Sequence, residues 1–148
     1  LAAEMLKAPA NLERAQRVVR SFYANKGIAI PELVIENGSG LSRRERISAR
    51  SMARVLQAAW ASPVMPELMS SLPLVGFDGT MKKRLNLRGV AGRAHIKTGS
   101  LAEVRSIAGY VLAASGKRYV VVAFVNHANA ADAQAAQDAL LQWIYDHG

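Results

Sequence analysis

The sequence lacks several residue types and patterns, and each absence excludes a class of protein or site. It has no cysteine, which excludes disulfide bonds and thiolate metal sites. No apolar run approaches the roughly 20 residues of a membrane-spanning helix, so we expect no transmembrane segment. No group of carboxylates or histidines has the spacing of metal ligands, and we expect neither a metal nor another cofactor.

Acidic residues are also few, because 11 Asp and Glu stand against 19 Lys and Arg, for a formal net charge of +8. This excess predicts attraction to anionic partners such as nucleic acid or an acidic envelope polymer, without choosing between them. Arg46, Arg50 and Arg54 repeat every four residues, which is typical of a solvated helix face. Without a helix-turn-helix, zinc or stacking-aromatic signature, we expect no nucleic-acid partner.

What is present suffices for a globular fold. The 148 residues, 51% of them hydrophobic, can form one domain, or a large piece of one, with a buried core. Because the first residue is Leu1 rather than Met, we expect the chain to be cut from a longer protein.

The N-terminal half has mainly helical periodicity. We expect the end of a helix over residues 1–7, and a second helix that Asn11 caps, that has its apolar residues on one face and that ends at Gly27 as its C-cap. Ser48 can cap a third helix over residues 49–61, and a short helix through Met69 follows. A short extended segment, residues 31–36, and the loops 37–41 and 72–80 connect these elements.

From Arg93 the pattern changes to that of β-strands. We expect one strand that ends in Lys97-Thr98-Gly99, and two further strands over residues 106–114 and 118–126. The near-continuous apolar run of the last strand predicts that both its faces are covered. With a final helix over residues 130–147, the pattern predicts an α/β (α+β) fold, in which helices cover an antiparallel sheet.

The strand with Lys97-Thr98-Gly99 has side chains and backbone groups suited to binding a peptide with a carboxylate. Successive side chains leave a strand on opposite faces, but at a sheet edge the long Lys97 stem can curl toward a carboxylate that the Thr98 hydroxyl also reaches. Gly99 leaves room for a substrate backbone that adds to the edge as an extra strand. The backbone N–H of Ser100 would point into the same cleft, where it could stabilise an acyl oxyanion.

Three motifs follow one another along the chain, and together they are far more specific than any one alone. They are residues 37–43 (Asn-Gly-Ser-Gly-Leu-Ser-Arg), residues 72–80 (Leu-Pro-Leu-Val-Gly-Phe-Asp-Gly-Thr) and residues 97–101 (Lys-Thr-Gly-Ser-Leu). In this order and spacing they resemble the C-terminal half of the D-alanyl-D-alanine carboxypeptidase/endopeptidase family, the class C low-molecular-mass penicillin-binding proteins. The resemblance implies that residues 1–148 are the C-terminal part of a penicillin-binding domain, with a partial β-lactamase/transpeptidase-like fold.

The resemblance also implies a function. It predicts a serine acyl-transfer enzyme of the bacterial periplasm that cuts D-Ala-D-Ala stem peptides and crossbridges of peptidoglycan and reacts with β-lactams. Ser42 would relay a proton between the lysine that serves the nucleophile and the leaving nitrogen. Lys97 would support Ser42 and the terminal carboxylate of the substrate, and Thr98 would bind that carboxylate too.

Two departures from the family pattern matter. The serine loop usually reads Ser-x-Asn, but Arg44 stands where the asparagine would be and becomes the candidate for contacting the substrate. No serine in the chain is followed three residues later by lysine, so the Ser-x-x-Lys nucleophile is absent. We expect it to lie before Leu1 in a longer parent, and the 148-residue chain alone to be inactive.

Two other interpretations stay open from the residues. Ser42 lies in a glycine-rich loop, where a serine commonly serves as a turn or capping residue. The chain could also be a basic domain without catalysis that binds peptidoglycan or nucleic acid.

Overall fold

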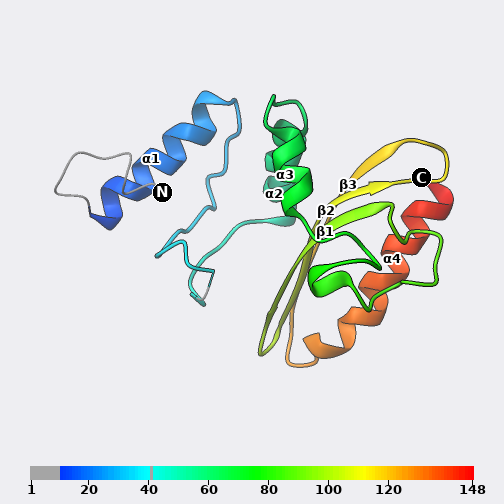
Figure 1. Cartoon of the computed structure of the whole chain (residues 1–148). Helices are drawn as coiled ribbons and strands as arrows, with labels where there is room; N and C mark the ends of the chain where they lie inside the picture. Colours follow the sequence, from blue (N-terminus) through cyan, green and yellow to red (C-terminus); the bar gives the residue numbers. More distant parts are fainter. Residues whose placement is uncertain (1–10, 41) are drawn as a thin grey trace. The chain divides into compact units, whose positions relative to one another are not determined.

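We analysed a computed structural model, which describes residues 11–40 and 42–148. The helix expected over residues 1–7 lies outside the described residues. The chain divides into two compact units, Leu1–Val55 and Leu56–Gly148 (Figure 1).

The first unit begins with helix α1 (Leu12–Asn25). The Asn11 side chain caps it as predicted, by accepting a hydrogen bond from the backbone N–H of Arg14 at 2.9 Å. Its C-cap is Lys26 rather than Gly27. Gly27 follows with a φ of +72°, a left-handed conformation that glycine adopts without steric cost. Gly27 therefore terminates the helix, although it lies one residue after the C-cap.

The apolar face of α1 is not deeply buried in the first unit. No residue of the helix is fully buried, and Leu12 and Phe22 stay about half exposed. Instead, the segment after the helix supplies the buried apolar side chains, namely Ile28, Ile30 and Leu33. Gln16 and Arg20 of α1 donate hydrogen bonds to backbone carbonyls of that segment, including those of Ile35 and Leu33. Polar side chains of α1 therefore satisfy the backbone of an irregular segment.

Helix α2 (Ala49–Trp60) begins where Ser48 was predicted to cap it. The Ser48 hydroxyl accepts the backbone N–H of Ser51 at 3.1 Å and donates to the Glu32 carboxylate at 2.5 Å. The Ser48 hydroxyl, followed by that of Ser51, lowers the pKa of Glu32 to about 2. The segment 31–36 leading to this cap is not a regular strand, and only Val34 pairs there, with Arg46.

The second unit contains the predicted sheet. Strands β1 (Ala94–Leu101), β2 (Val104–Leu112) and β3 (Arg118–Asn126) are antiparallel and lie in the order β1-β2-β3. Helix α3 (Met65–Ser71) precedes the sheet, and helix α4 (Ala133–His147) follows it after a 3₁₀ turn, Ala130–Asp132. The predicted fold class, an antiparallel sheet combined with helices, is confirmed.

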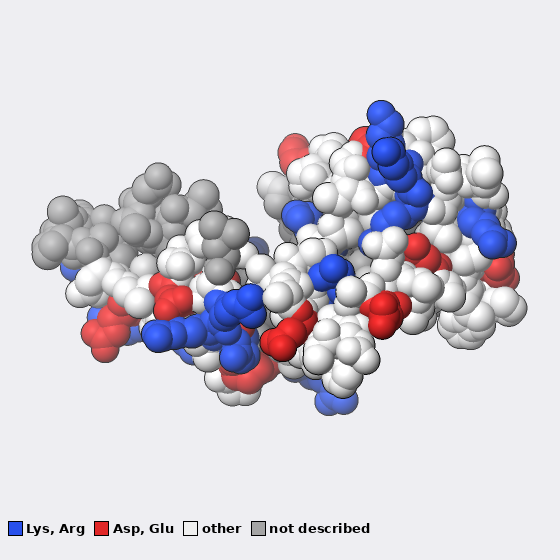
Figure 2. All heavy atoms as spheres, turned by 90° about the horizontal axis from the view of Figure 1, so that it is seen from below, with Lys and Arg blue, Asp and Glu red and all other residues white. Residues whose placement is uncertain are grey.

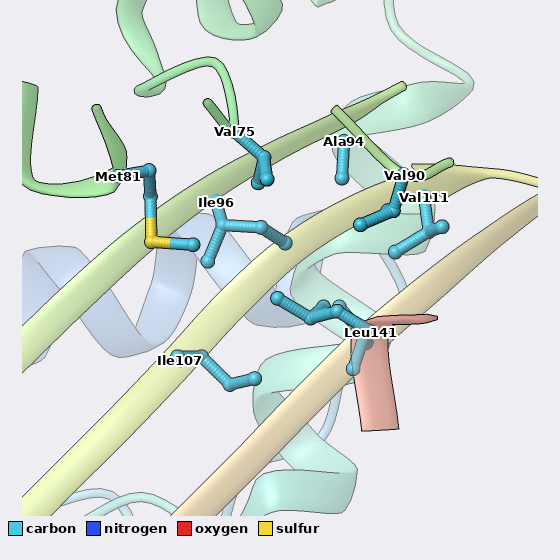
Figure 3. Packing of buried hydrophobic residues seen from close by; sticks show 9 residues of the cluster. Val75, Met81, Val90, Ala94, Ile96, Ile107, Val111 and Leu141 are labelled. Atoms are coloured by element: carbon cyan, nitrogen blue, oxygen red, sulfur yellow. The ribbon is translucent and has the colours of Figure 1, made fainter. Parts of the chain in front are cut away.

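The core of the second unit lies between the sheet, α4 and the segment before β1 (Figure 3). Its residues are all apolar: Val75, Met81, Val90, Ala94, Ile96, Ile107, Val111, Val121 and Leu141. Gly109 of β2 is part of the close packing, because a Cβ there would lie 2.0 Å from the backbone oxygen of His95. Strand β2 lies between the other two strands, and its Ile107 and Val111 side chains are fully buried.

Strand β3 is less covered than its apolar run predicted. Only Val121 is buried, and the other apolar residues of β3 are half-buried. The reason is topological, because β3 pairs with β2 alone among the described strands and forms an edge of the sheet.

The opposite face of the sheet packs against the end of α2. The Tyr110 hydroxyl donates to the backbone carbonyl of Leu56 at 2.6 Å. The Trp60 ring lies 5.5 Å from that of Tyr110, and the Arg118 guanidinium lies 4.9 Å from the Trp60 ring. Burial also raises the pKa of Tyr110 above its usual value. The last turn of α2 is thereby anchored to β2 and β3.

The segment before β1, predicted as a loop, is instead paired with the sheet. The N–H of Ile96 donates to the carbonyl of Pro73 at 2.8 Å, and the N–H of Val75 donates to the carbonyl of Ala94 at 2.9 Å. A short 3₁₀ turn, η1 (Gly79–Met81), follows. The outer edge of β1 is thus occupied along its first half.

Candidate active site

The second half of the β1 edge is where the predicted strand site lies. The backbone groups of Ala94 and Ile96 face outward to the Pro73–Val75 segment, and outward groups alternate along a strand. The N–H groups of Thr98 and Ser100 therefore also face outward. Within the described part of the second unit, no backbone segment pairs with them. This half of β1 can accept an added peptide strand.

Lys97 reaches this edge from the other face of the strand. Its side chain is exposed, and Nζ donates to the carbonyl oxygen of Thr98 at 2.8 Å. The lysine stem therefore curls around the strand, as the sequence predicted. An ammonium group and the Thr98 hydroxyl lie on the same short stretch of β1, which is a suitable arrangement for holding a carboxylate.

The Thr98 hydroxyl has a partner that the sequence did not indicate. Its Oγ1 lies 2.8 Å from Oγ1 of Thr80 in η1 and donates to it. Thr80 ends the 72–80 motif, which the sequence predicts as a loop without assigning a role to this hydroxyl. These are the two threonines of the sequence. Their contact depends on the pairing of the 73–75 segment with β1, which the sequence did not indicate.

The absence of a side chain at Gly99 has a structural reason in addition to the predicted functional one. A Cβ at this position would lie 2.4 Å from the Ser106 Oγ on β2, far inside normal contact. The Ser106 hydroxyl itself lies 3.4 Å from the carbonyl oxygen of Gly99. The glycine therefore makes room for a neighbouring side chain, whether or not a substrate also lies against it.

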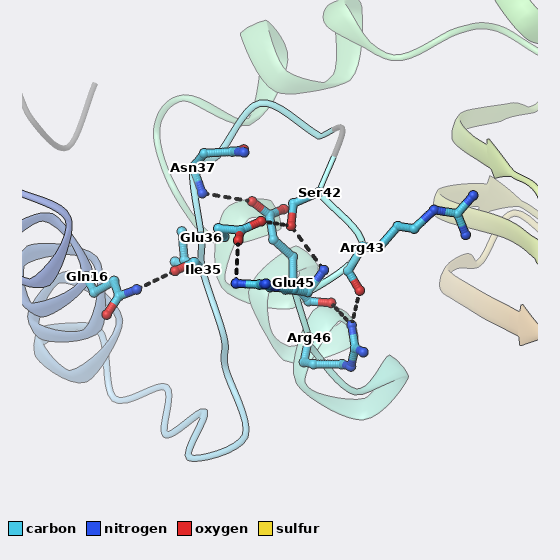
Figure 4. Close-up of polar contacts among 9 residues, drawn as sticks. Gln16, Ile35, Glu36, Asn37, Ser42, Arg43, Glu45 and Arg46 are labelled. Atoms are coloured by element: carbon cyan, nitrogen blue, oxygen red, sulfur yellow. Dashed lines mark hydrogen bonds and ion pairs between the residues drawn. The ribbon is translucent and has the colours of Figure 1, made fainter.

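Ser42 lies in the first unit, in a loop held by charged groups (Figure 4). Its hydroxyl donates to the Glu36 carboxylate and accepts the backbone N–H of Arg44 at 3.0 Å. The Arg44 guanidinium lies 3.3 Å from the other Glu36 oxygen. Glu45 accepts the backbone N–H of Gly38 at 2.9 Å. These local contacts are those of a turn-forming serine, the alternative that the sequence left open.

The predicted site residues therefore fall into two groups. Lys97, Thr98, Gly99 and Ser100 lie together on β1 in the second unit, and Ser42 and Arg44 belong to the first. That the two groups form one cleft stays a prediction.

The arginine stretch between them has mostly local roles. The Arg46 guanidinium donates to the carbonyls of Arg43 and Glu45 at 2.7 and 2.9 Å, and Arg50 and Arg54 are exposed on α2. On the face in Figure 2, basic side chains stand close to acidic ones. This pattern fits the interpretation of a solvated face.

The described residues contain neither a metal-binding cluster nor a membrane-spanning helix. No three His, Cys, Asp or Glu side chains there gather closely enough to hold a metal ion. No helix among them is long and apolar enough to cross a membrane.

Comparison with known proteins decides the family. A model of the D-Ala-D-Ala carboxypeptidase 3 (S13) family matches residues 1–146. The chain belongs to this family. The D-alanyl-D-alanine carboxypeptidase DacB of Haemophilus influenzae is 30% identical over 131 residues, which are 87% of this chain and 27% of that protein. A carboxypeptidase of Mycobacterium tuberculosis is 30% identical over 144 residues, 93% of this chain and 31% of that protein.

Solved structures give the same result for the fold. Penicillin binding protein 4 (dacB) of H. influenzae, in complex with a β-lactam, matches with a TM-score of 0.76 and 31% identity, over 84% of this chain and 29% of that one. A predatory endopeptidase of Bdellovibrio bacteriovorus matches in fold, with a TM-score of 0.68 and 18% identity, over 99% of this chain and 45% of that one. The chain thus spans about a third or less of the length of the curated relatives described above.

Proposed function

We propose that this chain is the C-terminal part of a serine D-Ala-D-Ala carboxypeptidase/endopeptidase, which acts on stem peptides and crossbridges of peptidoglycan in the bacterial periplasm. The observation that carries the proposal is the Lys97-Thr98-Gly99 motif on the open half of an edge strand, in a chain that belongs to the S13 family. An open edge next to an ammonium group and a hydroxyl suits a peptide with a free carboxylate.

In the proposed mechanism, the peptide adds to the edge of β1 and its backbone bonds to the outward groups of Thr98 and Ser100. The carboxylate lies against Lys97 and Thr98. A serine nucleophile outside these 148 residues attacks the carbonyl of the penultimate D-Ala, and the Ser100 N–H donates to the oxyanion that forms. The bond to the leaving nitrogen then breaks, which leaves an acyl-enzyme that water hydrolyses.

Ser42 has the role of a proton relay in this proposal. A relay must come within hydrogen-bond reach, about 2.6 to 3.2 Å, of the groups that it serves. In the first unit its hydroxyl donates to Glu36, so it must exchange this acceptor for another when the site assembles. Arg44, which pairs with the same carboxylate, would hold Glu36 during that exchange and would then contact the substrate.

The test is intact-mass spectrometry after incubation with a β-lactam. We expect the full-length protein to gain the mass of one β-lactam, and the 148-residue chain to gain none, because it lacks a Ser-x-x-Lys pair. Lys97→Ala in the full-length protein should slow acylation by at least about tenfold, the effect of losing one charged hydrogen bond.

Three outcomes would contradict parts of this proposal. Acylation of the isolated chain at any serine would show that the nucleophile lies within it. An unreactive full-length protein that still binds peptidoglycan would favour a binding domain without catalysis. A reactive protein in which Ser42→Ala reacts as fast as the wild type would restrict Ser42 to its turn.

A further inference from the structure

The two threonines of the chain touch each other at the mouth of the proposed site. Oγ1 of Thr98 on β1 and Oγ1 of Thr80 in η1 are 2.8 Å apart, although 18 positions separate them in the sequence. On the basis of the proposed function, we propose that Thr80 is a positioning residue that orients the Thr98 hydroxyl toward the free carboxylate of the substrate. This assigns a role to the Asp78-Gly79-Thr80 motif, which the mechanism above does not use.

Thr80 is held in place by its own segment. Just before it, the Asp78 carboxylate accepts the N–H of Leu74 at 2.7 Å. Just after it, the Met81 side chain is fully buried in the core, and the Met81 carbonyl accepts the N–H of Gly76 at 3.0 Å. Gly79 has a φ of +50° and lies against the Pro73 ring, where a Cβ would be 3.0 Å away. The Thr80 hydroxyl is therefore presented from a fixed backbone.

The chemistry of two hydroxyls explains why the contact is useful. Each hydroxyl has one proton to donate and can accept further hydrogen bonds, and its proton can rotate. Without a ligand, Thr98 donates to Thr80. When a carboxylate binds, Thr98 turns its proton to the anion, and Thr80 can donate its own proton to the Thr98 oxygen. The second bond strengthens the first, because hydrogen bonds in a chain polarise one another.

The same segment sets where a bound peptide must end. Pro73–Val75 occupies the edge of β1 up to Ile96, so an added strand finds open backbone groups only from Thr98 onward. A peptide that adds antiparallel to β1 runs its carboxyl end toward Ile96 and stops at Thr98. Its terminal carboxylate then lies beside the two hydroxyls. The arrangement favours a peptide whose free carboxyl group ends beside Thr98.

The experiment uses the full-length protein and two synthetic peptides that end in D-Ala-D-Ala, one as the free acid and one as the C-terminal amide. Thr80→Val removes the hydroxyl and keeps the side-chain shape, and Thr80→Ser restores the hydroxyl. Thr80 is exposed, so these variants should keep their fold, which thermal unfolding checks. Ser115→Ala is the matched control, because it removes a hydroxyl from the turn between β2 and β3, where that hydroxyl accepts the N–H of Lys117.

We expect Thr80→Val to lower kcat/KM for the acid about tenfold and to leave the amide within about twofold, whereas Thr80→Ser and Ser115→Ala resemble the wild type. An equal loss for both peptides, or no loss for either, would overturn the role of Thr80. If the wild-type protein cleaves neither peptide, the proposed function itself fails, and the inference fails with it.

Discussion

The Ser42 loop of the first unit and the β1 edge of the second are built by different forces. The loop is held by side-chain carboxylates, and its Arg44–Glu36 ion pair leaves the arginine side chain 82% exposed. Strand β1 is held by backbone pairing with β2 along its whole length and with Pro73–Val75 along its first half, above a core whose central residues are fully buried. Exposed ion pairs contribute about 0–1 kcal/mol each, so the loop can rearrange at little cost.

In the proposed function, this difference gives the two regions different parts. The β1 edge would hold a peptide in register before any reaction. The Ser42 loop would exchange its hydrogen-bond partners, which a proton relay needs. A rigid strand and an adaptable serine loop are therefore complementary, and the following variants test whether each region depends on the force assigned to it.

The largest effect is expected from Gly109→Ala in β2. The new Cβ would lie 2.0 Å from the His95 oxygen, which is backbone and cannot rotate away. We expect a loss of at least about 3 kcal/mol in the free energy of unfolding, because β1 must separate from β2. Denaturant unfolding measures the loss, and hydrogen exchange should show that β1 loses protection.

Gly116→Ala is the control for this substitution. Gly116 has open space around it but a φ of +85°. Alanine there should therefore lower the free energy of unfolding only through its strained left-handed backbone, by about 1 kcal/mol. If the two variants lose equal stability, close strand packing does not hold the β1 edge.

A smaller effect is expected at Gly99, and it separates packing from function. Gly99→Ala should cost about 1–2 kcal/mol of folding stability, because its Cβ would meet the Ser106 hydroxyl at 2.4 Å. Ser106→Ala removes that hydroxyl and should be nearly neutral alone. The double variant should then regain most of the stability, which denaturant unfolding of all four proteins measures as a coupling energy.

Acylation of the same four variants in the full-length protein completes the test. If Gly99 serves only to accommodate Ser106, the double variant reacts as fast as the wild type. If a substrate backbone also lies against Gly99, the double variant is stable but slow.

The features that local rules determine were predictable from the sequence. Asn11 and Ser48 cap their helices because a short polar side chain just before a helix can accept a free backbone N–H of its first turn. The strands β1, β2 and β3 follow from a change of period and from the Ser115-Gly116 turn. Lys97, Thr98, Gly99 and Ser100 lie together on β1 because they share one motif, and their role as a site stays a prediction.

The missed features depend on pairing between distant segments. Pro73 and the Asp78-Gly79 turn signal predicted a loop, yet Pro73 pairs with β1 through its carbonyl alone and so needs no N–H. The contact between Thr80 and Thr98 exists only because of that pairing. Likewise, the exposure of Leu12 and Phe22 could not be read from the helical period, which fixes a face but not what covers it.

The smallest effect concerns pH, and it separates the two units directly. The folded-state pKa of Glu32 is about 2, below its ordinary value of 4.5, so its carboxylate stabilises the first unit above pH 4.5. That contribution is lost as the pH falls from about 4.5 toward 2, and the start of α2 should loosen. Far-UV circular dichroism would report this loss of helix. Both tryptophans, Trp60 and Trp143, lie in the second unit, so their fluorescence should change only at lower pH.

Glu32→Gln should remove this acid transition, because glutamine does not titrate. Ser48→Ala should remove most of it, because it deletes the hydroxyl that chiefly lowers the pKa of Glu32. Ser48→Ala should in addition cost about 1 kcal/mol at neutral pH, since it removes the cap of α2. Glu13→Gln is the control, because Glu13 lies on α1 and forms an exposed ion pair with Arg17 at 3.8 Å. If dichroism and fluorescence change together in the wild type, the two units unfold as one. The serine loop would then be as firmly held as the β1 edge, and its proposed adaptability would need another origin than weak local contacts.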